Sequence, residues 1–216
     1  MSLNGFASVI LDVDSTLCRV EGIDWLARRR GAEVCDHVAK LTDRAMRGEI
    51  ALENVYAERL ALVHPTWDDI AALANAYAET LAPGAEDAVR RLVAAERRVV
   101  LVSGGIREAI LPVALRLGIP RRDVYAVSTR FDELGEFIGF ESDSPLATAT
   151  GKRAVAESIG LPPRVLAMGD GVTDLAMRPA VDAFAAFTGF VHRDQVVELA
   201  DVVLESFDQL VELVLA

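Results

Sequence analysis

The feature that most constrains the fold is an alternation of apolar strands and amphipathic helices that begins near Ala85. The expected strands are Arg98–Val102, Val124–Val127, Val165–Met168, Phe184–Phe187 and Val202–Leu204. The expected helices are Ala85–Glu96, Arg107–Leu117, Lys152–Ile159, Asp174–Met177 and Phe207–Leu215. Parallel strands need long crossover connections, which helices provide. The alternation therefore predicts an α/β fold in which helices cover both faces of a parallel sheet, with a hairpin at Phe131–Phe140.

The segment 17–81 has a different pattern, helical and poor in strands. Apolar residues recur there at intervals of three and four, which is typical of amphipathic helices. The expected helices are Trp25–Arg30, Glu33–Arg47, Leu52–Val63 and Trp67–Thr80, the last capped by Thr66. We expect this segment to be an all-helical cap inserted after the first strand. Residues 1–16 and 82–216 would then form the α/β core.

Composition limits the class of protein. The chain has 216 residues, is 52% hydrophobic and carries a formal charge of −11. A core of ordinary size is possible, and the acidic balance argues against nucleic acid as a partner. We find no signal region and no apolar stretch of membrane-spanning length. Two cysteines, Cys18 and Cys35, are typical of a reducing compartment, so we expect a cytoplasmic protein, monomeric or homodimeric.

The first strand, an apolar run over Val9–Leu11, ends in two carboxylates, Asp12 and Asp14. Side chains two apart on a strand share a face, so both carboxylates can be aimed at one point. Ligands of open α/β sheets bind at the carboxyl ends of strands. The same residues also fit a polar strand end that turns into a loop.

Two further segments suit an anion. Ser103, Gly104 and Gly105 follow the strand Arg98–Val102 and precede a helix, where backbone N–H groups can approach a phosphate. Lys152 follows Gly151 at the start of a helix. A P-loop is excluded, because Leu146 and Arg153 occupy positions where that motif requires Gly and Ser or Thr. An ordinary tight turn and a solvated lysine remain the alternatives.

The strand Val165–Met168 leads into Gly169-Asp-Gly-Val-Thr-Asp, which places Asp170 and Asp174 four residues apart. Carboxylates flanked by glycine suit a hard cation such as Mg²⁺, although Asp170 could equally be a helix cap. Together, the paired aspartates, the Ser-Gly-Gly segment, the lysine and this carboxylate pair lie at strand ends or helix starts of one sheet. That combination indicates phosphoryl transfer through a carboxylate nucleophile.

In this order the four segments resemble the haloacid dehalogenase superfamily, and most closely its phosphoserine phosphatase family. The motifs that carry the resemblance are Asp12-Val-Asp-Ser-Thr, Glu21-Gly-Ile-Asp, Arg44-Ala-Met, Glu58-Arg-Leu-Ala-Leu, Ser103-Gly-Gly, Gly151-Lys152, Gly169-Asp-Gly-Val-Thr-Asp, Asp182-Ala-Phe and the ending Phe207–Leu215. They extend over nearly the whole chain. The resemblance implies a Rossmann-like core and Mg²⁺-dependent hydrolysis of O-phospho-L-serine, the last step of serine synthesis.

The resemblance also implies roles for individual residues. Asp12 would be the nucleophile that forms an aspartyl-phosphate, and Asp14 the general acid and base. Mg²⁺ would be held by Asp12, the backbone carbonyl of Asp14 and Asp170, with Asp174 in support. The phosphoryl oxygens would be held by Ser103, Gly104 and Lys152, with Gly105 completing the loop.

The resemblance assigns amino-acid recognition to the expected cap. Glu21 would pair with the ammonium group and Arg59 with the carboxylate, although both residues also fit ordinary surface charges. Met46 matches a substrate-contact position, and Thr173 stands where some members have Asn. Arg47 and Leu52 depart from the residues common in the family, Gly and Phe, so the shape of the cap contact is open.

Three other functions remain open at this stage. The substrate could be another small phosphomonoester, such as phosphohomoserine. The phosphoryl group could pass to an alcohol instead of water, which would make the chain a phosphotransferase. The chain could also be an inactive binding protein, since a fold alone does not fix function.

Overall fold

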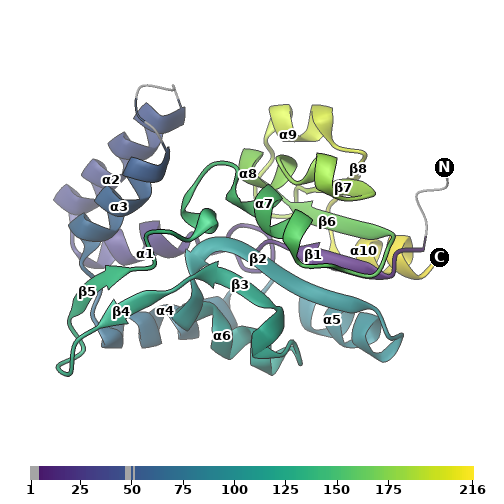
Figure 1. The fold of residues 1–216 in the computed structure, drawn as a ribbon, viewed down its shortest axis with the longest axis horizontal. Coiled ribbons are helices and arrows are strands. Elements are labelled where there is room, and N and C mark those ends of the chain that lie inside the picture. Colours follow the sequence, from purple (N-terminus) through teal and green to yellow (C-terminus); the bar gives the residue numbers. More distant parts are fainter. Residues whose placement is uncertain (1–4, 47–49, 51) are drawn as a thin grey trace.

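The computed structural model describes residues 5–46, 50 and 52–216. At its centre lies a six-stranded parallel sheet with strand order β3-β2-β1-β6-β7-β8 (Figure 1). Its strands are β1 (Ser8–Leu11), β2 (Arg98–Ile106), β3 (Val124–Val127), β6 (Val165–Gly169), β7 (Ala183–Phe187) and β8 (Val202–Leu204). This confirms the predicted α/β class.

Helices cover both faces of the sheet. In Figure 1, α6 lies below β2 and β3, and α7 lies above the sheet. The helices of the described residues are α1 (Gly22–Arg29), α2 (Ala32–Met46), α3 (Leu52–Val63), α4 (Trp67–Glu79), α5 (Ala85–Ala94), α6 (Arg107–Arg116), α7 (Gly151–Ser158), α8 (Val172–Leu175), α9 (Asp194–Leu199) and α10 (Phe207–Leu215). None of them combines the length and the apolar character that a membrane crossing needs.

The hydrophobic core is built around the central strands. Val9, Ile10 and Leu11 of β1 are fully buried, as are Leu166 and Met168 of β6. Strands buried on both faces carry continuous apolar runs rather than alternating ones, which is why these segments were recognisable in the sequence. The polar residues that follow such strands are held at the rim of the core.

The pairing of β1 with β6 positions the site. Leu11 lies opposite Met168, and the backbone N–H of Asp12 donates to the carbonyl of Met168 over 3.0 Å. Chain order along the sheet reverses here, since β2 and β3 lie on one side of β1 and β6–β8 on the other. Ligands of open α/β sheets bind at such a switch point, outside the carboxyl ends of the strands.

The helices α1–α4 follow β1 along the chain, and α2 and α3 stand at the left of Figure 1, away from most of the sheet. The predicted Thr66 cap is present, because its hydroxyl accepts from the Asp69 N–H and the Asp69 side chain accepts in return from the Thr66 N–H. α4 packs against α6 of the core. Its first residue, Trp67, also donates its N–H to Gly135.

The hairpin predicted at Phe131–Phe140 is present as β4 (Thr129–Phe131) and β5 (Phe137–Phe140), a separate antiparallel pair beside the helices α1–α4 (Figure 1). Its turn is closed by the Asp132 carboxylate, which accepts the N–H groups of Leu134 and Glu136. Aromatic rings of Trp67 and Phe131 meet edge to face. The hairpin is thereby fixed against the start of α4.

Some predicted boundaries were wrong, and one helix was missed. β2 continues to Ile106, so Ser103, Gly104 and Gly105 lie in extended backbone instead of a turn; Ile106 still pairs with Val127 after a register shift. α8 begins at Val172 and not at Asp174, because the Asp174 side chain caps the helix from within its first turn. α9 was missed, since six residues are too few to show a helical period.

Candidate active site

A cavity of about 340 Å³ opens where the carboxyl ends of β1, β2 and β6 face α1 and α3. Its wall contains most of the residues that the sequence singled out: Asp12, Asp14, Glu21, Arg59, Gly104, Gly105, Lys152, Asp170, Thr173 and Asp174. These residues come from six different segments of the chain. Parallel pairing places the carboxyl ends of β1, β2 and β6 at one edge of the sheet.

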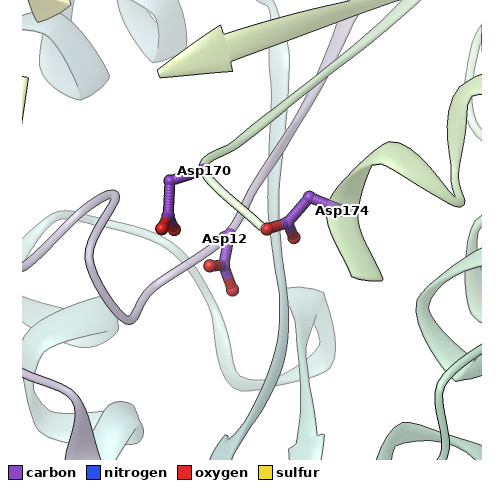
Figure 2. Close-up of side chains that lie close together, drawn as sticks. All are labelled: Asp12, Asp170 and Asp174. Carbon is purple, nitrogen blue, oxygen red and sulfur yellow. The ribbon is translucent and has the colours of Figure 1, made fainter. Parts of the chain in front are cut away.

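Three carboxylates meet at the base of the cavity (Figure 2). The side chain of Asp12 lies between those of Asp170 and Asp174, and one oxygen of each carboxylate lies within 4.8 Å of the others. All three residues are buried. Burial raises the pKa of Asp12 well above its ordinary value, and the charge of Asp174 adds to this rise while Lys152 opposes it. A cluster of this kind needs positive charge to keep its members ionised.

Lys152 supplies part of that charge. From the second position of α7, its Nζ donates to Asp12 Oδ1 over 2.5 Å and to Asp174 Oδ1 over 2.6 Å. Burial acts to lower the pKa of Lys152, but the two carboxylates outweigh burial and hold the pKa above its usual value. The lysine predicted as a phosphate ligand therefore also connects the end of β1 to α8.

Hydrogen bonds to both of its oxygens hold the Asp174 carboxylate in place. Its Oδ2 accepts the N–H of Gly171 over 2.9 Å, while its Oδ1 accepts from Lys152. Gly169 makes this approach possible, because a Cβ there would lie 2.2 Å from the Asp174 Cγ. The glycine of the Gly169-Asp170 pair is thus required by packing.

Asp14 lines the same cavity as Asp12 and has different partners. Its Oδ1 accepts from the Tyr77 hydroxyl over 2.7 Å and from the Gly22 N–H over 2.8 Å. Burial, with a further contribution from the charge of Glu21, raises the pKa of Asp14 to about 7, and the two hydrogen bonds only partly offset this rise. A carboxyl group with this pKa can both give and take a proton near neutral pH.

The sequence reasoning did not find the partners of Asp170. Thr16 donates to Asp170 Oδ1 over 3.1 Å, and Arg193 forms an ion pair with Asp170 Oδ2. Arg193 also lines the cavity. It lies in the loop after β7, another parallel strand whose carboxyl end faces this edge of the sheet, and that topology was the available signal. Tyr77, from α4, gave no local signal at all.

The segment 103–105 only partly matches its prediction. Gly104 and Gly105 line the cavity, and a Cβ on Gly105 would approach Asp14 Oδ2 to 2.8 Å. Ser103 is fully buried and is not part of the cavity wall; its hydroxyl accepts the Gly105 N–H over 2.9 Å. The tight packing explains the glycine at position 105, whereas Ser103 fixes the backbone that carries Gly104 and Gly105.

Glu21, Thr173 and Arg59 lie on the cavity wall as expected. Glu21 accepts from the Ser15 hydroxyl over 2.6 Å, which ties it to the loop that follows β1. Arg59, from α3, donates through Nη2 to Asp24 Oδ1 over 2.6 Å. The side chain of Met46, and Arg47 and the side chain of Leu52, fall outside the described residues, so their expected substrate contacts stay predictions.

The donor set fits a divalent cation. Five carboxyl groups but only three cationic side chains occur among the described residues that line the cavity. Asp12, Asp170 and Asp174 offer oxygen ligands, which hard cations such as Mg²⁺ prefer. The prediction of a metal at this cluster is therefore consistent with its chemistry and its charge.

Comparison with known proteins gives similarity over almost the whole chain. A family model of haloacid dehalogenase-like hydrolases matches residues 6–182. The chain is 38% identical over 209 residues to the chloroplastic phosphoserine phosphatase of Arabidopsis thaliana, a match that covers 94% of this chain and 70% of the relative.

Two solved structures are also similar. A substrate-bound phosphoserine phosphatase complex has a TM-score of 0.74 at 26% identity and covers 94% of this chain and 95% of its own. A phospho-aspartyl intermediate analogue of phosphoserine phosphatase has a TM-score of 0.72 at 25% identity, with 95% and 97% covered. The range matched by the family model includes β1, β2 and β6, whose carboxyl ends face the cavity.

Proposed function

The chain belongs to the haloacid dehalogenase-like hydrolases and, within them, to the phosphoserine phosphatases, and we propose that it hydrolyses O-phospho-L-serine through a phosphorylated Asp12. The observation that carries the proposal is the arrangement around Asp12. A buried carboxylate in contact with Lys152 shares one cavity with Asp14, whose pKa of about 7 suits proton transfer. Serine release by this reaction would complete serine synthesis.

In the first step, Asp12 attacks phosphorus and the bond to the serine oxygen breaks. Asp14 donates its proton to that oxygen, so that the leaving group departs as a neutral hydroxyl. Lys152 and the backbone near Gly104 stabilise the negative charge on the transferring phosphoryl group. Tyr77 and the Gly22 N–H orient the Asp14 carboxyl during this transfer.

In the second step, Asp14 takes a proton from water, which attacks the phosphorylated Asp12 and releases phosphate. Both carboxyl groups then regain their starting protonation states. Mg²⁺, held by Asp12, Asp170 and the backbone carbonyl of Asp14 with Asp174 in support, would offset the repulsion between a carboxylate and a phosphate dianion.

Recognition of the amino acid is proposed for the side of the cavity formed by α1 and α3. Glu21 would pair with the ammonium group, and Arg59 with the carboxylate. The contact with Asp24 supports this role, because it fixes the position of the Arg59 guanidinium at the cavity wall.

The test is phosphate release from O-phospho-L-serine, with Mg²⁺ and with chelator, beside phosphohomoserine and simple phosphomonoesters. We expect metal-dependent turnover that prefers phosphoserine. Asp12→Asn should abolish turnover, whereas Asp143→Asn, an exposed control, should retain it. Metal-dependent turnover of other esters with little on phosphoserine would overturn the assigned substrate. Full turnover by Asp12→Asn would show that Asp12 is not the nucleophile.

A further inference from the structure

Two hydrogen-bond donors on the α3 side of the cavity have no acceptor within the described part of the chain. They are the hydroxyl of Tyr56 and the Nε of Arg59, both buried and both on residues of the cavity wall. The two residues are three positions apart on α3 and therefore neighbours on one face of the helix. Buried polar groups normally have a partner, so two orphaned donors side by side indicate a missing acceptor.

The Tyr56 hydroxyl is held in place by its surroundings. Tyr56 is only 8% exposed, and its ring packs against Phe140 of β5 with centroids 5.3 Å apart. Burial raises the pKa of Tyr56, so the hydroxyl stays protonated and able to donate. The ring contact restricts movement of the Tyr56 side chain at the cavity wall.

The chemistry of the missing acceptor follows from the charges around it. The proposed phosphoryl site is on the core side, at Asp12, Lys152 and Gly104. The ammonium group is expected at Glu21. What remains near a tyrosine hydroxyl and a guanidinium is a group that only accepts, which in an amino-acid phosphate is the carboxylate.

We propose that Tyr56 is a specificity-determining residue whose hydroxyl donates a hydrogen bond to the substrate carboxylate, beside Arg59. The inference rests on the proposed phosphoserine substrate and adds a recognition residue that sequence motifs do not indicate. A planar carboxylate would then be bound by two donors from one helix face. Substrates without a carboxylate would not gain this hydrogen bond and would therefore bind less tightly than phosphoserine.

The experiment compares Tyr56→Phe with wild type on phosphoserine and on phosphoethanolamine, which keeps the phosphate and the ammonium but lacks the carboxylate. The variant keeps the ring that packs on Phe140. We expect kcat/KM for phosphoserine to fall about tenfold or more, mainly through KM, because a hydrogen bond to a charged group is lost. Phosphoethanolamine, assayed as substrate or as competitive inhibitor, should change less than about twofold.

A purely structural role for the hydroxyl predicts a different pattern. Removing an unpaired buried hydroxyl should leave the unfolding temperature of the free protein unchanged or slightly raised. Removing a hydroxyl that makes a structural hydrogen bond would lower that temperature. Tyr125→Phe, on β3 outside the cavity wall, is the matched control and should alter neither substrate.

Equal losses on both substrates, or no loss on phosphoserine, would overturn the role of Tyr56 while leaving the proposed function intact. Wild-type protein that does not turn over phosphoserine would instead overturn the proposed function, and the inference with it. The two failures are therefore distinguished by the wild-type assay alone.

Discussion

Lys152 is expected to be the main support of the carboxylate cluster, and its replacement by methionine tests this directly. Lys152 Nζ lies 2.5 Å from Asp12 Oδ1 and 2.6 Å from Asp174 Oδ1, and all three side chains are at most 8% exposed. At an effective dielectric constant of about 20, each contact contributes about 6 kcal/mol of gross Coulomb attraction. Much of this offsets the cost of removing the charges from water.

Loss of the lysine leaves the carboxylates buried without their shared cation. Breaking such a pair from one side costs about 3–5 kcal/mol of unfolding free energy. For a chain of this size, that corresponds to a fall of roughly 6–20 °C in the unfolding temperature. Methionine keeps most of the packing volume, so the loss reports on charge rather than on a cavity.

The assay is thermal unfolding at neutral pH in the presence of chelator. The control is Arg153→Met on the next residue of α7, whose ion pair with Glu157 is half exposed and should contribute less than about 1 kcal/mol. Adding Mg²⁺ should reduce the difference in unfolding temperature between Lys152→Met and wild type, because the cation would replace part of the lost charge. The double variant Asp12→Asn/Lys152→Met should recover part of the stability, since one of the unpaired charges is gone.

Two results would refute this reasoning. In the first, Lys152→Met would unfold within roughly 2 °C of Arg153→Met, a difference of less than about 1 kcal/mol. In the second, the double variant would lose more unfolding free energy than the two single variants lose when their losses are added. Either result would mean that the carboxylates are stabilised by other groups or are largely protonated in the folded protein.

Two further predictions concern positions outside direct catalysis. Burial alone would raise the pKa of Asp69, but hydrogen bonds from Arg30, the Thr66 N–H and Arg29 hold it well below its usual value. The stability that the Asp69 carboxylate contributes is therefore present above its unfolded-state pKa of about 4 and is lost as the pH falls below that value. Asp69→Asn should lower the free energy of unfolding by about 1–2 kcal/mol at pH 7 and by progressively less in acid, as measured by urea unfolding. A loss of stability that does not change with pH would contradict this. Gly169→Ala should destabilise the protein by about 1–3 kcal/mol in the same assay, because the new methyl group would displace Asp174. The same displacement should weaken metal binding. Unchanged metal affinity would show that Asp174 is not needed at the cluster.

The central strands and most helices could be predicted because their signals are local. Continuous apolar runs predicted β1 and β6, and Thr66 as a capping residue predicted the start of α4. Even so, β2 continues beyond its apolar run, because backbone pairing with β3 resumes at Ile106 whatever the side chains are. Local pattern thus predicts the presence of an element better than its end.

The residue types that follow the strands can be read from the sequence, and Asp12, Asp14 and Asp170 follow β1 and β6, so they are expected to share one edge of the sheet. Lys152 and Asp174 lie at helix starts, in α7 and α8. Parallel topology places all carboxyl ends on the same side, so no long-range information was needed for that step. The residue types there were sufficient to indicate phosphoryl transfer through a carboxylate.

The partners of these groups depend on tertiary contacts that the sequence does not reveal. Tyr77 and Arg193 reach Asp14 and Asp170 across 63 and 23 residues of chain, and Tyr56, which belongs to no motif, lines the cavity. Such contacts depend on how helices pack and loops return, which a local pattern does not encode. The unpaired Tyr56 hydroxyl follows from burial, so it too became visible only once the chain was folded.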